Sequence, residues 1–235
     1  MKDELFKEPQ SSAFAFTPAV AGVFDDMITR SVPYYKEIVD FSTSIAAEYL
    51  QENDIVYDLG SATGATLFTL ARKCNKNLEL IGIDNAPAML EKAKQKADFF
   101  GIKADFLEAD IIDFEFKKCN AIFANFTLQF IRPPNRLELI TKLCSALNSG
   151  GIFLFAEKII STDLKLSKIL INTHHEFKKA QGYSELEIMQ KREALENVLV
   201  PYTASENEDM AINGGFSYVE IIFRYGNFAL FIAVK

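Results

Sequence analysis

The stretch that decides the fold lies at residues 55–64 and reads IVYDLGSATG. A short apolar run ends in an acid, and two glycines then bracket three small residues. Residues 65–72, ATLFTLAR, continue with the apolar spacing of an amphipathic helix. A strand, a small-residue loop and a helix predict the start of a βαβ unit. The glycines allow a tight turn, and the loop precedes a helix whose first backbone N–H groups face a ligand.

The loop alone does not define a ligand. The nucleotide fingerprint G-x-G-x-x-G is absent, because Ala62 and Ala65 stand where further glycines would be. A plain strand-to-helix turn in an α/β domain would have the same pattern. The rest of the chain therefore has to decide between a structural turn and a binding loop.

Strands and helices alternate from residue 55 onward. We expect strands at 55–60, 78–84, 103–108, 120–125 and 152–157, and helices at 64–74, 87–99 and 134–147. This alternation predicts parallel strands joined by right-handed crossovers, and the nearly continuous apolar strands predict a sheet covered on both faces. A short helix at 204–214 and strands at 217–223 and 227–234 follow. The expected fold class is therefore α/β: a Rossmann-like sheet, mostly parallel, with an antiparallel C-terminal hairpin.

Two segments flank this core within what we expect to be a single domain over residues 1–235. Residues 1–52 combine a mobile arm over 1–18 with two helices over 19–52, and Pro33 is expected at the first position of the second helix. The alternation of strands and helices stops after the fifth strand, and residues 163–199 form one long helical region that is interrupted near residue 182. Ser184 and Glu187 have the spacing of a capping box, so a new helix is expected to start there. We interpret this second segment as a helical lid.

Composition narrows the class of protein. The net charge is −7 and the 25 Lys and Arg residues form no dense cluster, which argues against direct tRNA binding. The three isolated cysteines fit buried thiols in a reducing cytosol. The N-terminus has no apolar signal region, and no apolar run is long enough for a membrane span, so a cytoplasmic protein is expected. No cluster with metal-ligand spacing is present, and we expect no metal.

Polar residues recur where the predicted strands end. Asp84 closes the second strand and is placed to accept hydrogen bonds from both hydroxyls of a ribose. Asn85 follows it, and Asn125 closes the fourth strand. After the third strand, Asp110 could bind an amino group while Ile111 covers a purine ring. A single aspartate after a strand is as often a helix cap, but two in register with a glycine loop predict a nucleoside site.

The missing motifs define the kind of nucleoside. No G-x-x-x-x-G-K-[ST] marks a triphosphate site. Asp58 stands two residues before Gly60, where a carboxylate would repel phosphates but suits the ammonium group of an amino acid. Acids before the glycine loop, after the second strand and after the third are typical of S-adenosylmethionine enzymes. The chain resembles a class I S-adenosylmethionine-dependent methyltransferase.

A narrower resemblance covers essentially the whole chain. It rests on these segments: RSVP at 30–33, YDLG at 57–60, IDN at 83–85, NFTLQF at 125–130, HHEFK at 174–178, GYSELEI at 182–188 and QKR at 190–192. Together they resemble the carboxy-S-adenosylmethionine synthase family, which serves wobble-uridine modification of bacterial tRNA. The segments within 163–199 are more specific than the glycine loop. Residues 61–63 read SAT where the family often has CSL, which is a mild departure because backbone contacts matter most there.

The resemblance implies a reaction and roles for residues. The family converts S-adenosylmethionine, as a substrate, and prephenate into carboxy-S-adenosylmethionine and phenylpyruvate. Arg192 would bind the new carboxylate across a homodimer interface, and Tyr35 would lie near it. The nucleoside and methionine parts would contact the following residues: Tyr35, Asp58, Gly60, Ser61, Ala62, Asp84, Asn85, Asp110, Ile111, Asn125 and Arg192.

Alternatives remain open from the residues alone. An ordinary methyltransferase acting on tRNA or a small acid would share the fold, as would a non-catalytic nucleoside-binding module. His174 and His175 are adjacent on a predicted helix and point about 100° apart, so packing roles are favoured over a shared metal or substrate. Lys178 and Lys179 are expected to be surface charges.

Overall fold

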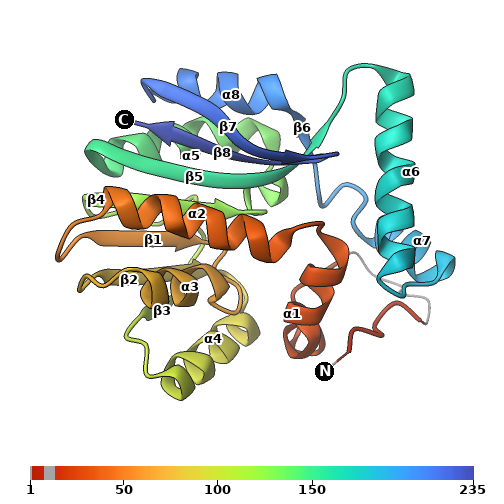
Figure 1. The fold of residues 1–235 in the computed structure, drawn as a ribbon, viewed down its shortest axis with the longest axis horizontal. Helices are drawn as coiled ribbons and strands as arrows, with labels where there is room; N and C mark the ends of the chain where they lie inside the picture. The colour runs from red at the N-terminus through yellow and green to blue at the C-terminus, as the bar shows by residue number, and fades with distance from the viewer. Residues whose placement is uncertain (1, 8–13) are drawn as a thin grey trace.

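The computed structural model describes residues 2–7 and 14–235. Its centre is an eight-stranded sheet in which seven strands have the order β3-β2-β1-β4-β5-β8-β7, with β6 pairing β5 off this path (Figure 1). The strands are β1 Ile55–Leu59, β2 Glu79–Asp84, β3 Asp105–Glu108, β4 Cys119–Asn125, β5 Leu147–Ile160, β6 Tyr202–Thr203, β7 Tyr218–Tyr225 and β8 Phe228–Val234. The neighbouring pairs β3-β2, β2-β1, β1-β4 and β4-β5 are parallel, whereas β8 is antiparallel to both β5 and β7. The predicted fold class, including the antiparallel hairpin, is confirmed.

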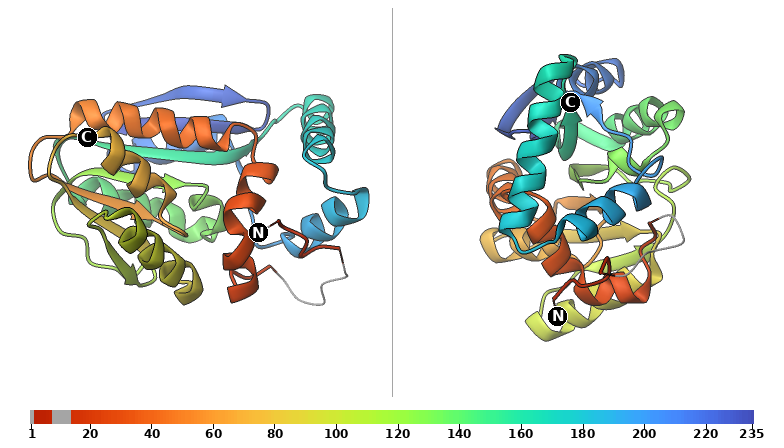
Figure 2. Two further views of the ribbon diagram at one scale, coloured as in Figure 1. Left: turned by 60° about the horizontal axis from the view of Figure 1, so that its bottom comes forward. Right: turned by 90° about the vertical axis from the view of Figure 1, so that its right-hand side faces the viewer.

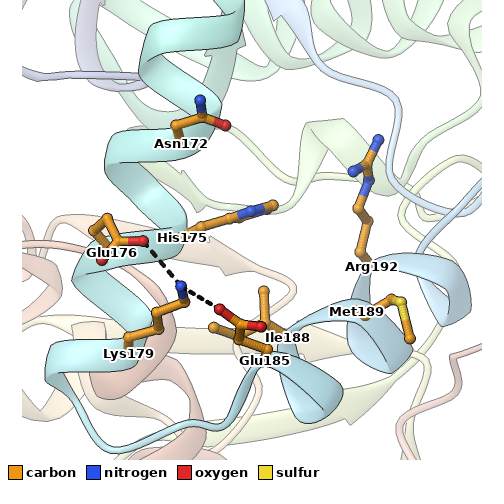
Figure 3. A pocket seen from close by; sticks show the side chains of 8 residues that line it. All are labelled: Asn172, His175, Glu176, Lys179, Glu185, Ile188, Met189 and Arg192. Carbon is orange, nitrogen blue, oxygen red and sulfur yellow. Dashed lines mark hydrogen bonds and ion pairs between the residues drawn. The ribbon is translucent and has the colours of Figure 1, made fainter.

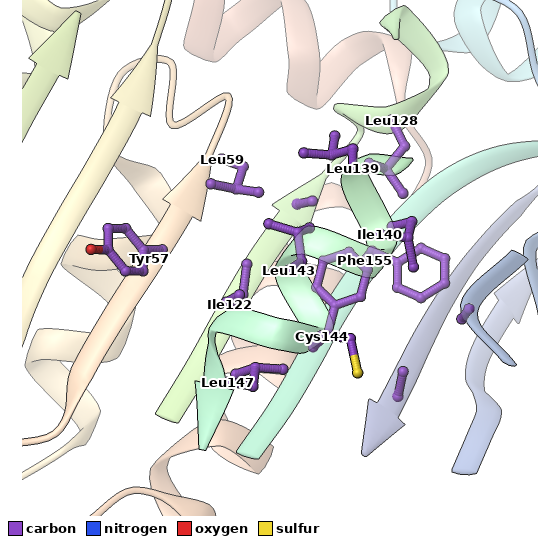
Figure 4. Packing of buried hydrophobic residues seen from close by; sticks show 14 of the residues in the cluster. Tyr57, Leu59, Ile122, Leu128, Leu139, Ile140, Leu143, Cys144, Leu147 and Phe155 are labelled. Atoms are coloured by element: carbon purple, nitrogen blue, oxygen red, sulfur yellow. The ribbon is translucent and has the colours of Figure 1, made fainter. Parts of the chain in front are cut away.

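Helices cover both faces of the sheet. They are α1 Pro18–Ser31, α2 Tyr35–Tyr49, α3 Ala65–Lys73, α4 Pro87–Phe100, α5 Pro133–Ala146, α6 Leu164–Ala180, α7 Glu185–Ala194 and α8 Ala204–Asn213. One core cluster joins α2, α3 and α4 to one face, and a second joins α5 and α8 to the other. In the second cluster Leu139, Ile140 and Leu143 of α5 pack against Leu59, Ile122 and Phe155 of the sheet (Figure 4). Strand side chains alternate between these two cores, as the two-sided burial of the strands predicts.

Two strand predictions need correction. The fifth strand begins at Leu147 rather than 152 and continues to Ile160, although Asn148 to Gly151 read as a turn. The pairing with β4 shifts register between Cys119 and Ala121, so this polar stretch interrupts the ladder, and Gly150 takes a positive φ of 76° within it. The two-residue strand β6 was not predicted, because its two pairs with β5 leave no periodic signal.

The N-terminal segment is packed over its described residues. Phe6 is 5% exposed, and Asp3 is 1% exposed and accepts a hydrogen bond from the Tyr183 hydroxyl. The sequence predicts a mobile arm here, whereas Asp3 and Phe6 are buried in the structure; residues 1 and 8–13 lie outside the described part. The two helices expected after it are α1 and α2. Pro33 is not the first helical residue, since Tyr34 takes a left-handed φ of 58° and α2 begins at Tyr35.

Helices α1, α6 and α7 lie beyond the carboxyl ends of the parallel strands (Figures 1 and 2). Helix α6 stands apart from the sheet layers, and only His174 of its residues is buried. Helix α7 begins at the predicted capping box, in which the Ser184 amide and hydroxyl both donate to Glu187 Oε2. No helix within the described residues is long and apolar enough to cross a membrane. The arrangement brings residues far apart in sequence to one end of the sheet.

Candidate functional site

A cavity of about 620 Å³ opens at the carboxyl ends of the parallel strands, within the size range of small-molecule sites. All the residues expected from sequence line it except Arg192, namely Tyr35, Asp58, Gly60, Ser61, Ala62, Asp84, Asn85, Asp110, Ile111 and Asn125. Three acids among them, Asp58, Asp84 and Asp110, define what we call the acid end of the cavity. The periodic strands place these residues together because parallel strands end at the same edge.

The glycine loop is held by contacts that exclude side chains. Gly60 has a φ of 64°, and a Cβ there would lie 2.6 Å from Thr127 Oγ1. That hydroxyl donates to the Leu59 carbonyl at 2.8 Å, so it fixes the loop after β4 against the end of β1. Gly64 has a φ of 83° and precedes α3. Both glycines are therefore required by the backbone, which leaves the loop close to whatever occupies the cavity.

Asp84 connects the loop to β2. Its Oδ2 accepts from the Ala62 amide at 2.9 Å, and its Oδ1 accepts from the Ala86 amide at 2.9 Å. Burial raises the pKa of this carboxyl, and the backbone hydrogen bonds oppose that rise. Each carboxylate oxygen has a second lone pair, so the group can still accept hydrogen bonds from a ribose.

Asp58 lies deeper, at 2% exposure. Burial raises the pKa of its carboxyl to about 8, repulsion from Asp84 adds to the rise, and a hydrogen bond from Thr66 opposes it. Burial also raises the pKa of Tyr35, with a further contribution from the Asp58 charge. A carboxyl whose ionisation is this costly is stabilised as an anion when a cation comes close.

Two buried side-chain oxygens at the acid end lack hydrogen-bond partners within the described residues. These are Ser61 Oγ and Asn125 Oδ1, while Asn125 Nδ2 donates to Thr66 Oγ1 at 3.2 Å. Buried polar atoms are rarely left unpaired in folded proteins, and both atoms belong to residues that line a cavity with further polar groups. The donor and acceptor set fits the hydroxyl, amino and carboxyl groups of a nucleoside joined to an amino acid.

The opposite end of the cavity carries cations that sequence reasoning did not assign. Lys158, Lys178 and Lys191 line it, and we call this the lysine end. Lys178 was expected at the surface, but the structure places it in the cavity, where burial and then the charge of Lys158 lower its pKa to about 7. Lys179 points elsewhere and pairs with Glu176 and Glu185, as a surface charge would. The sequence did contain one indication of this position: Lys178 lies one helical turn after His174, so the two side chains share a face of the helix.

His174 has a packing role, as expected. Its Nε2 lies 2.8 Å from the Ser31 carbonyl oxygen, and its ring meets Phe228 edge-on at 4.9 Å between centroids. Burial lowers the pKa of this imidazole to about 3, so the ring stays neutral at physiological pH. These contacts position α6 on the end of α1, and hence place Lys178.

Arg192 does not line the cavity of its own chain. Its exposed side chain lines a smaller pocket of about 380 Å³ between α6 and α7. Figure 3 shows Arg192 from α7 and His175 from α6 projecting into the same space, with Lys179 bridging Glu176 and Glu185 at its edge. The structure thus separates this residue from the others that were expected to form the site. Among the described residues, no group of three or more His, Cys, Asp or Glu side chains could hold a metal ion.

The chain has the class I methyltransferase fold, and comparisons with known proteins agree. A family model for a methyltransferase domain matches residues 56–151. An O-methyltransferase family protein from Burkholderia thailandensis shares the fold with a TM-score of 0.68 at 16% identity, covering 97% of this chain and 64% of that one. Human N-acetylserotonin methyltransferase in complex with S-adenosylmethionine has a TM-score of 0.62 at 13% identity, covering 93% and 55%.

Sequence relatives define the family more narrowly. Carboxy-S-adenosyl-L-methionine synthase from Nautilia profundicola is 49% identical over 235 residues, covering all of both chains. The enzyme of that name from a Nitratiruptor species is 50% identical over 234 residues, covering 100% of this chain and 98% of its own. The chain belongs to the carboxy-S-adenosyl-L-methionine synthases, a family of S-adenosylmethionine-dependent transferases.

Proposed function

We propose that the protein converts S-adenosylmethionine and prephenate into carboxy-S-adenosylmethionine and phenylpyruvate. The observation that carries the proposal is one cavity with an acid end and a lysine end. A sulfonium with an ammonium group matches the first end, and a dicarboxylate matches the second. Likeness over the full length to synthases of this name supports the same assignment.

At the acid end, the residues would hold S-adenosylmethionine as a substrate. Asp58 pairs with the ammonium group of the methionine part, and Asp84 accepts from the ribose hydroxyls. Asp110 accepts from the adenine amino group, while Ile111, at 6% exposure, covers the ring. Ser61 and Asn125 supply the unpaired oxygens. This set leaves the sulfonium methyl facing the rest of the cavity.

The chemistry needs no side-chain nucleophile. Prephenate breaks the bond between its ring carbon and carboxyl carbon, releases carbon dioxide and expels its ring hydroxyl as hydroxide, which leaves phenylpyruvate. The hydroxide removes a proton from the sulfonium methyl group and becomes water. The resulting carbanion carbon attacks the carbon dioxide and forms the new carboxymethyl group. The protein contributes by positioning the reactants and excluding bulk water.

A homodimer would complete the site. The outer face of α6 and α7 carries exposed apolar side chains, including Leu164 at 86%, Ile169 at 50% and Met189 at 51%. Such a face on a helix with one buried residue suits a second copy of the chain. Arg192 stands beside this face, so dimerisation would allow it to reach the partner's cavity. There, its guanidinium would bind the newly formed carboxylate.

The product would serve as a carboxymethyl donor for wobble-uridine modification of tRNA in the cytoplasm. The tRNA itself is expected to meet a different protein, because a net charge of −7 does not favour direct binding of this chain to RNA.

The proposal is tested by incubating the protein with S-adenosylmethionine and prephenate and recording product masses. We expect an ion heavier than S-adenosylmethionine by one carbon dioxide, together with phenylpyruvate, and neither product when prephenate is omitted. S-adenosylhomocysteine that forms only after an acceptor is added would instead identify an ordinary methyltransferase. Retention of ligand through purification with no turnover would identify a binding module.

A further inference from the structure

Two lysines at the lysine end have free ammonium groups. Lys158 lies near the end of β5 and Lys178 lies on α6, and both are half-buried in the cavity wall. Within the described part of the chain, neither ammonium group has a hydrogen-bond or ion-pair partner. Burial lowers the pKa of both ammonium groups, the charge of Lys158 lowers that of Lys178 further, and the charge of Arg192 lowers both. An acidic protein that places unpaired cations side by side holds a site for an anion.

The framework that holds this pair is built from other residues. The amide of Lys158 donates to Gln129 Oε1 at 3.1 Å. The preceding residue, Glu157, turns to the other side of β5, where it accepts from the Leu128 amide at 2.9 Å. On α6, His174 is fixed to Ser31 one turn before Lys178. The anchoring contacts therefore do not use the two ammonium groups.

Lys191 has a different position from this pair. Its ammonium group donates to Ser31 Oγ at 2.8 Å; burial lowers its pKa to about 8, and the nearby charge of Asp3 opposes that fall. It therefore helps to hold the N-terminal segment and the α1 end together. A ligand carboxylate would meet Lys158 and Lys178 as the unpaired cations.

We propose that Lys158 and Lys178 bind the carboxylate of the 2-oxo acid side chain of the co-substrate, the carboxylate that survives the reaction. This inference rests on the proposed function and deepens it. The ring carboxylate leaves as neutral carbon dioxide, so a cation bound to it would stabilise the starting state more than the transition state. The side-chain carboxylate keeps its charge from substrate to product, so cations bound there position the reactant without opposing its decarboxylation.

The substitutions Lys158→Met and Lys178→Met remove each charge and keep the apolar stem. Lys179→Met is the matched control, because that neighbour is paired with two glutamates outside the cavity. We expect the KM for prephenate to rise about tenfold or more in either cavity variant, since hydrogen bonds to charged groups are among the stronger ones. S-adenosylmethionine should bind the cavity variants no more weakly than it binds the wild type, and the control should behave as the wild type.

Phenylpyruvate distinguishes the two carboxylates, because it keeps the side-chain carboxylate and lacks the one on the ring. Its Kd for the protein loaded with S-adenosylmethionine, measured by calorimetry, should rise about as much as the KM for prephenate. If phenylpyruvate binds both variants as it binds the wild type, the assignment of the surviving carboxylate is overturned. Lys178→Arg should recover part of the affinity, whereas a purely structural role would not distinguish arginine from methionine.

The two proposals fail differently. If the wild type makes no carboxylated product, the proposed function fails, and the calorimetric comparison still tests whether these lysines bind a 2-oxo acid. If the wild type turns over and both methionine variants keep the wild-type KM and the wild-type Kd for phenylpyruvate, only the lysine assignment fails. Unchanged thermal unfolding of the variants excludes loss of folding as the cause.

Discussion

Substituting Asp58 by asparagine tests how the acid end recognises a cation. The carboxyl is 2% exposed, and burial raises its pKa to about 8. At pH 7 about nine in ten free molecules therefore hold the proton. An ammonium group bound next to Asp58 favours the ionised form, so binding of S-adenosylmethionine at pH 7 should release close to one proton per site. Asparagine keeps the size and removes the ionisation.

The magnitude follows from two opposing contributions. A hydrogen bond between charged groups stabilises a complex by about 1.5–3 kcal/mol. Removing the proton at pH 7 from a group of pKa about 8 costs about 1.4 kcal/mol. The net contribution at pH 7 is therefore at most about 2 kcal/mol, and Asp58→Asn should weaken binding by at most about thirtyfold. The loss should be larger at pH 8, where the proton has already begun to leave.

Stability should change in the opposite direction. The carboxyl of the unfolded chain ionises above its ordinary pKa of 3.8, whereas the folded one holds its proton until about pH 8. The folded state therefore binds more protons over this range, and the free energy of unfolding falls by about 1.4 kcal/mol per pH unit as pH rises. Asparagine removes this loss. At pH 7 the free energy of unfolding of the ligand-free variant should therefore exceed that of the wild type by on the order of 4 kcal/mol.

Calorimetry in buffers of different ionisation enthalpy counts the released protons, and thermal unfolding from pH 5 to 8 measures the stability change. Titrations between pH 6 and 7 keep the amino group of the ligand protonated, since its ordinary pKa is about 7.7–8.0. Within that window the wild-type affinity should rise about tenfold and the variant affinity should stay flat. A wild type that releases no proton, with a variant of equal affinity and equal Tm, would refute the reasoning.

Three further predictions address the loop, the arginine and the proposed dimer. Gly60→Ala would force alanine into a φ of 64° and bring its Cβ to 2.6 Å from Thr127 Oγ1, so calorimetry should find S-adenosylmethionine bound about tenfold or more weakly; unchanged binding would contradict the close approach. Arg192→Ala should weaken the binding of carboxy-S-adenosylmethionine more than the binding of S-adenosylmethionine. Equal losses of affinity would mean that the arginine does not recognise the carboxylate. Ile169→Asp, on a side chain 50% exposed, should shift sedimentation from dimer to monomer, and an unchanged dimer would place the interface elsewhere.

The acid end could be predicted from sequence because backbone periodicity determines it. Parallel strands end at one edge, so Asp58, Asp84 and Asn125 had to come together once the strands were identified. Gly60 and Gly64 identify the loop because local backbone geometry requires them. The contacts that hold this loop are harder to predict, because the hydrogen bond from Thr127 to Leu59 depends on how the loop after β4 folds back.

The lysine end could not be predicted because it depends on where a helix docks. Helix α6 is amphipathic, but its apolar side chains Leu166 and Ile169 are exposed and His174 is its one buried residue, so the pattern does not identify the face that meets the cavity. Lys178 and Lys179 are neighbours, yet one faces the cavity and the other pairs with Glu176 and Glu185. Successive side chains on a helix point about 100° apart, and the contacts of His174 with Ser31 and Phe228 set which of the two lysines faces the cavity. The packing of Asp3 against Tyr183, 180 residues away, is equally non-local.

The opposed ends of the cavity imply that the two substrates bind cooperatively. A sulfonium bound alone brings a further positive charge into a cavity that already holds Lys158 and Lys178. A 2-oxo acid carboxylate neutralises part of that charge, so each ligand should bind more tightly in the presence of the other. Coupling energies of this kind are typically about 1–3 kcal/mol, or roughly 5- to 150-fold in affinity.

Titrating S-adenosylmethionine with and without saturating phenylpyruvate measures this coupling without turnover. Linkage requires the same factor when the order of addition is reversed. The factor should shrink in Lys178→Met, because the repulsion that the carboxylate relieves has been reduced, and it should persist in Lys179→Met. Equal affinities with and without phenylpyruvate in the wild type would mean that the lysine end and the sulfonium do not interact, so the lysines would contribute to carboxylate binding alone.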